Sequence, residues 1–84
     1  MAEESVGKVV HYFVKAGVAG LKLTGTLHAG DTVRFKGHTT DFTQIVESMQ
    51  VENKAVEVAG PGDEAGIKVK DRVREHDQVL VVTE

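Results

Sequence analysis

The chain has 84 residues, which is the length of a single domain. Its 10 Lys and Arg residues against 13 Asp and Glu residues give a formal net charge of -3, which argues against a protein that coats nucleic acid non-specifically. There is no cysteine for disulfides or thiolate metal sites, and no apolar run is long enough to span a bilayer. We therefore expect one domain over residues 1–84, in the cytoplasm and without membrane contact, with residues 1–5 as a disordered tail.

The first half of the chain has the composition and alternation of β-strands. The segment beginning at Val6 is rich in β-branched and aromatic residues, and the next one contains Gly20, as at a β-bulge. After a turn at Gly30 and Asp31, apolar and polar residues alternate strictly. The strands expected in this half cover residues 6–14, 18–24 and 32–36.

The second half continues with short strands. The longest candidate covers residues 42–51, and its alternation slips near Glu47 and Ser48, which predicts a bulge. Residues 60–63, Gly-Pro-Gly-Asp, are the strongest turn signal. Residues 71–75 are the expected place for a helical turn. The further strands expected cover residues 55–59, 67–69 and 78–83.

About seven short strands, with turns roughly every 8–12 residues and no long amphipathic helix, indicate an all-β barrel or sandwich. A barrel is the better prediction at this length, because closure removes exposed strand edges. Val9 and Phe13 share strand parity, as do Val79 and Val81. The side chains expected in the core are apolar: Val9, Phe13, Leu23, Leu27, Val33, Phe35, Val46, Met49, Val58, Ile67, Val69, Val79 and Val81.

An ordered series of short motifs resembles the second domain of elongation factor Tu-type GTPases. The motifs are Gly7-Lys8-Val9, Gly25-Thr26-Leu27, Gly30-Asp31-Thr32-Val33, Val46-Glu47-Ser48-Met49, Ala59-Gly60-Pro61-Gly62-Asp63, Gly66-Ile67-Lys68-Val69, and Val73-Arg74 followed by Asp77-Gln78-Val79-Leu80. This resemblance implies a closed, six-stranded, Greek-key-like barrel. With its phrases HYF, GHTTDFTQ and ESMQ, the chain also resembles the small stand-alone proteins called translation elongation factor-like and the C-terminal barrel of the collagenase-like peptidase family.

The elongation-factor resemblance implies two site residues. In aminoacyl-tRNA carriers a glutamate on the central strand helps to form the pocket for the terminal adenosine, and Gln50 stands at that position. Asp63 falls where an acidic residue lies near the acceptor end. The chain has no G-x-x-x-x-G-K-[ST] sequence, so we expect no GTP binding.

A basic segment near the C-terminus is the main candidate from the residues themselves. Lys68, Lys70, Arg72 and Arg74 alternate with apolar residues, so in an extended chain they would line one face over roughly 20 Å, the spacing of several phosphates. They could contact an RNA backbone. The alternative is a solvated outer face, neutralised by Asp71, Glu75 and Asp77.

No constellation of catalytic or metal-binding residues is evident. The separations of His11, His28, His38 and His76 fit no local metal motif, and surface histidines are the simpler interpretation. There is no G-x-S-x-G and no Cys nucleophile. We expect a protein that is not an enzyme and has no cofactor or metal.

Two functions from different classes remain open. One is a translation-related module that binds structured RNA or a ribosome-associated component through Lys68, Lys70, Arg72, Arg74, Gln50 and Asp63. The other is a protein-docking module that acts in trans with an enzyme related to the collagenase-like peptidase family. Salt dependence separates the two, because phosphate contacts weaken steeply with salt and apolar docking does not.

Overall fold

Ten β-strands form the secondary structure of residues 2–83, the part of the chain that the computed structural model describes. The all-β prediction is confirmed. The strands are β1 Ala2–Phe13, β2 Val18–Leu23, β3 Leu27–His28, β4 Thr32–Lys36, β5 Asp41–Ile45, β6 Met49–Val51, β7 Lys54–Val56, β8 Val58–Ala59, β9 Glu64–Lys68 and β10 Gln78–Thr83.

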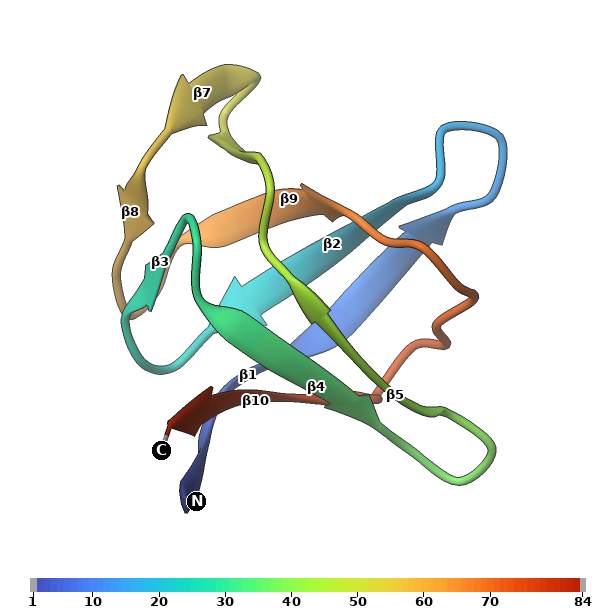
Figure 1. Cartoon of the computed structure of the whole chain (residues 1–84). Coiled ribbons are helices and arrows are strands. Elements are labelled where there is room, and N and C mark those ends of the chain that lie inside the picture. Colours follow the sequence, from blue (N-terminus) through green and yellow to red (C-terminus); the bar gives the residue numbers. More distant parts are fainter. Residues whose placement is uncertain (1, 84) are drawn as a thin grey trace.

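Eight strands belong to one antiparallel sheet in the order β5-β4-β10-β1-β2-β9-β6-β7, and β3 and β8 form a separate ribbon (Figure 1). The sheet curves around the core, but its ladder is open, with β5 at one end and β7 at the other. The prediction of a closed, six-stranded barrel is therefore wrong in its closure and in its strand number.

The ladder stays open because the expected long strand over residues 42–51 is broken. The backbone of Val46 hydrogen-bonds to Gly30 and Asp31, and its side chain is buried in the core. After this turn the chain re-enters the sheet as β6, beside β9 instead of β4. The slip in alternation near Glu47 and Ser48 is thus a break between two strands, not a bulge within one.

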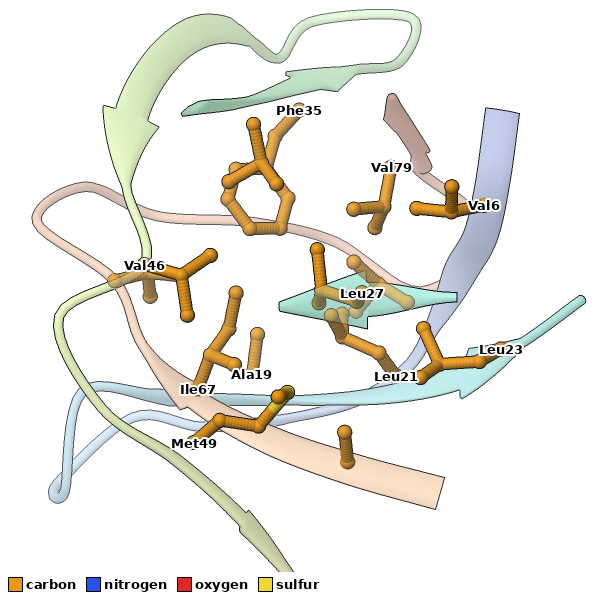
Figure 2. Packing of buried hydrophobic residues seen from close by; sticks show 14 of the residues in the cluster. Val6, Ala19, Leu21, Leu23, Leu27, Phe35, Val46, Met49, Ile67 and Val79 are labelled. Carbon is orange, nitrogen blue, oxygen red and sulfur yellow. The ribbon is translucent and has the colours of Figure 1, made fainter. Parts of the chain in front are cut away.

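A single apolar cluster fills the interior. Figure 2 shows side chains of β4 and β10, such as Phe35 and Val79, pointing toward those of β2, β6 and β9, with Leu27 between them. Phe35 is fully buried and stacks on Phe42 at a centroid distance of 5.0 Å. Truncating such a side chain leaves a cavity that removes several kcal/mol of stability.

Most of the expected core residues are buried, but Phe13 and Val58 are half exposed, at 50% and 51%, and Val81 is only partly buried. The register between β1 and β2 shifts between Val9 and His11. This bulge inverts the alternation of β1, so Tyr12 packs against the core and Phe13 points outward. The sequence placed the irregularity in β2, at Gly20, but the extra residue is on β1.

The two ends of the described chain pair with each other. Ala2 to Ser5, expected as part of a disordered tail, instead form the first part of β1, and the register runs from Ala2 opposite Thr83 to Ser5 opposite Leu80. The continuous apolar run Val79 to Val82 suits a strand with a neighbour on each side, and β4 supplies only one of the two.

Three four-residue turns share one hydrogen-bond pattern. They cover residues 28–31, 60–63 and 74–77, and each ends in aspartate. In each, the backbone N–H of the aspartate donates to the carbonyl of the first residue at 3.1 Å, and the aspartate carboxylate accepts the N–H of the first residue at 2.8–2.9 Å. The third residue has positive φ in all three: Gly30 at 94°, Gly62 at 89° and His76 at 75°.

Within residues 2–83 the structure contains no helix, and residues 71–75, expected as a helical turn, form an irregular segment. That part of the chain accordingly has no helix long and apolar enough to cross a membrane.

Candidate functional site

The basic segment, residues 68–74, runs from the end of β9 into an irregular stretch. Ile67, Val69 and Val73 are buried, and the four cations Lys68, Lys70, Arg72 and Arg74 are exposed. The predicted alternation therefore holds, although regular strand geometry ends at Lys68. Among residues 2–83, none of these four side chains forms an ion pair within 4.0 Å.

Gln44 of β5 anchors the start of this segment. Its side-chain Nε2 donates to the carbonyl of Lys68 at 2.8 Å, and its Oε1 accepts the N–H of Lys70 at 2.9 Å. The N–H of Val69 donates to the carbonyl of Gly17 at 2.9 Å. A side-chain amide thus joins residues 68–70 to β5, with no backbone ladder between them.

The four cations divide into two pairs along the outer edge of β5. Lys68 and Lys70 line a groove of about 600 Å³ together with Thr43, Gln44 and Ile45. Arg72 and Arg74 line a second hollow of about 330 Å³ beside residues 39–42. They therefore do not form one continuous extended row, but all four lie beside the same strand.

Gln50 and Asp63 lie elsewhere. Gln50 pairs with Gly66 in the sheet and lines a hollow of about 320 Å³ over Gly20 and Gly66. The Asp63 carboxylate accepts the backbone N–H of Gly60 at 2.9 Å, which closes a turn, and the residue lines a different hollow. The six predicted site residues thus form one group of four and two separate positions.

A further charged cluster joins three strands on the outside of the sheet. Arg34 of β4 forms a two-pronged ion pair with Asp41 of β5, both contacts at 2.8 Å, and its Nη1 lies 2.9 Å from Oε2 of Glu3 in β1. The hydrogen bond from Arg34 lowers the pKa of Asp41, and the hydrogen bonds to Asp41 and Glu3 raise the pKa of Arg34. This cluster links β1, β4 and β5.

The imidazoles and carboxylates of residues 2–83 include no group of three or more that could hold a metal ion. His11 packs against Phe13 with a centroid distance of 4.3 Å, and His28 lies 3.7 Å from Asp31.

Sequence reasoning missed the edge of β5 as a feature, because it merged β5 and β6 into one strand. The break at Val46, which leaves β5 at the end of the sheet, depends on a contact with residues 30–31. The slip in alternation near Glu47 was the one sequence signal of that break.

Comparison with known proteins relates the chain to proteases. No family model matches it. It is 39% identical over 80 residues to an uncharacterized protease of Methanocaldococcus jannaschii, covering 94% of this chain and 20% of that protein. It is 40% identical over 76 residues to a collagenase of Porphyromonas gingivalis, covering 88% of this chain and 21% of that protein. The chain thus spans about a fifth of the length of the curated relatives it matches.

Solved structures agree with this relationship. The C-terminal domain of a putative U32 peptidase of Geobacillus thermoleovorans superposes with a TM-score of 0.89 at 25% identity, covering 95% of this chain and 93% of that domain. Its selenomethionine variant gives 0.86 at 26% identity, covering 90% and 96%.

The homologues of this chain are C-terminal domains of U32 peptidases and collagenase-like proteins, which confirms that part of the resemblance. These proteases and solved domains are not translation factors, so the resemblance to an elongation-factor domain stays a prediction.

Proposed function

We propose that this chain is a non-catalytic docking module that acts in trans with an enzyme of the U32 peptidase class. The observation that carries the proposal is its similarity, along nearly its whole length, to the isolated C-terminal domain of such a protein. In the full-length relatives, four fifths of the chain lie outside the matched region. A domain of this kind acts by positioning a partner or a substrate for chemistry that is carried out elsewhere.

The use of polar side chains in the fold supports a binding role. The carboxylates of Asp31, Asp63 and Asp77 close turns, and the amide of Gln44 anchors the basic segment. Each of these groups is fixed by backbone hydrogen bonds, so its geometry serves the fold. The exposed cations beside β5 are, in contrast, available for contact with a partner.

The test is direct binding to a purified U32-class protein from the same organism. We expect a one-to-one complex by light scattering that is insensitive to ribonuclease and whose affinity falls less steeply with salt than that of a four-phosphate RNA contact. The complex should form without GTP. If no complex forms, or if ribonuclease abolishes it, the docking function is wrong.

RNA contact by the basic segment is a second proposal, favoured by the exposure of all four cations. Four phosphate contacts would give a slope of log affinity against log salt of about -3. The double change Lys70→Ala and Arg72→Ala should reduce that slope by about half. A titration of bulk tRNA at two salt concentrations measures it, and equal binding by both proteins would refute the RNA contact.

A further inference from the structure

The edge of β5 is one of the two ends of the sheet. β5 is the end strand and pairs only with β4 within residues 2–83. The N–H of Val46 donates to the carbonyl of Asp31, and hydrogen-bonded pairs alternate along an antiparallel ladder. The backbone N–H and C=O groups of Thr43 and Ile45 therefore point away from β4. They form a template to which another extended chain can add.

A groove lies beside this edge, lined by residues of β5 and by residues 68–70. It holds about 600 Å³ between β5 and residues 68–70. Phe42 and Gln44 lie on the inner face of β5, where Phe42 stacks on Phe35, so the Gln44 amide crosses to the basic segment beneath the edge. Its two hydrogen bonds fix the distance between the two walls. The groove is thus formed in the free protein.

The side chains of the groove define the chemistry of its occupant. Lys68 and Lys70 are exposed on one wall, which favours carboxylates. Ile45 is 57% exposed at the edge itself, where it can contact an apolar side chain. Glu47 lies at one end of the groove and disfavours an acidic residue there.

The other end of the sheet lacks these features. β7 has three residues, Lys54–Val56, against five in β5, and it carries a lysine. A charged residue on a short edge strand is a common protection against strand addition. The centre of β5 carries Thr43 and Ile45 instead, so its edge is open to pairing.

We propose that the β5 edge takes an extended, acidic segment of the partner protein as an additional strand, with its carboxylates against Lys68 and Lys70. The inference rests on the proposed docking function and names the surface that carries it. Backbone pairing gives affinity, and the two lysines select acidic over basic segments.

A titration of the isotope-labelled protein with a synthetic peptide of alternating Glu and Val residues tests the proposal. We expect the amide resonances of Thr43 and Ile45 to shift, and a peptide of alternating Lys and Val to bind at least about tenfold more weakly. N-methylation of the peptide amides that face β5 should weaken binding about tenfold or more, because it removes several hydrogen bonds without altering the protein.

Variants of the chain provide matched comparisons. Thr43→Pro removes an outward N–H and should abolish binding, whereas Thr43→Ala should keep it. The double change Lys68→Glu and Lys70→Glu should reduce the affinity for the acidic peptide about tenfold or more. The change Lys54→Glu at the other edge of the sheet should leave that affinity unaltered. Circular dichroism verifies that each variant is folded.

Several outcomes would overturn the proposal. They are absence of binding at millimolar acidic peptide, equal binding of the N-methylated peptide, shifts centred on β7, and a dimer of this chain joined through β5. If the complex with the U32-class protein survives both Thr43→Pro and the double charge reversal, the β5 edge is not the docking surface. The docking function itself would still stand. If the peptide binds at β5 but no complex with the U32-class protein forms, the docking function is wrong, although the β5 edge still binds extended acidic segments.

Discussion

The turns at residues 60–63 and 74–77 have the same hydrogen bonds but different surroundings. Asp63 lies at the surface after a glycine, whereas Asp77 is 4% exposed and follows His76, which has a φ of 75°. Each turn also pairs its backbone with a distant residue in the same way. Gly62 N–H donates to the Leu23 carbonyl at 2.9 Å and Leu23 N–H to the Asp63 carbonyl at 3.0 Å, and His76 N–H donates to the Val9 carbonyl at 2.7 Å and Val9 N–H to the Asp77 carbonyl at 2.8 Å. The comparison teaches that one local motif, joined to a distant strand by the same backbone hydrogen bonds, can hold its carboxylate at the surface or in the interior.

The largest difference in stability between the two turns should appear when the aspartate carboxylate of each is removed. Asp77→Ala removes a buried carboxylate and leaves the partly buried N–H of Arg74 without its acceptor, so we expect a loss of about 2–3 kcal/mol. Asp63→Ala should cost about 1 kcal/mol or less, because water can replace the exposed carboxylate. Urea unfolding of both variants measures this, and equal losses would show that burial does not separate the two turns.

The next largest loss of stability should come from Gly37, which lies opposite the buried turn. A Cβ at Gly37 would overlap the Asp77 carboxylate, so Gly37→Ala should cost about 1–3 kcal/mol. In the double variant with Asp77→Ala the two losses should not add, because the overlap is gone. Additive losses in a double-mutant cycle would contradict this contact.

Substitutions at the third position of these two turns should change the stability of the protein in opposite directions. His76→Gly should stabilise the protein by about 1 kcal/mol, since a residue with a side chain is strained at positive φ. Gly62→Ala should destabilise it by a similar amount for the same reason. Thermal unfolding compares the pair, and a loss of stability in His76→Gly would mean that the imidazole makes a compensating contact.

The smallest change in stability should come from Asp41. Its exposed carboxylate binds the guanidinium of Arg34, whereas the turn aspartates bind a backbone N–H. Arg34 lowers the pKa of Asp41 in the folded state. The resulting stability is present above the unfolded pKa of about 3.9 and is lost as the pH falls through the lower folded value. Asp41→Asn should therefore unfold slightly more easily than the parent near neutral pH and equally in strong acid. A difference that persists in acid would assign the effect to packing.

The sequence predicted the all-β class and the alternation of the basic segment because both depend on neighbouring residues. Val69 and Val73 are buried, and Lys68 and Lys70 between the apolar positions are exposed, as expected. Local patterns of this kind are set by the pleat of the strand.

The failures all depend on contacts between distant residues. The open ladder follows from the meeting of Val46 with residues 30–31, the outward position of Phe13 follows from a bulge opposite β2, and Gln44 reaches the basic segment across the sheet. A glutamine in a strand has no local feature that marks it as such an anchor. The edge of β5 could therefore be recognised only in the folded chain.

The pairing of β1 with β10 has a mechanical consequence. Ala2 lies opposite Thr83, so the two ends of the described chain meet at one end of an antiparallel ladder (Figure 1). A force applied to these ends loads one pair of residues at a time, so the hydrogen bonds of the ladder break in sequence. In a shear geometry, by contrast, all of them would carry the force together. The domain should therefore extend at low force when pulled from the paired ends of β1 and β10.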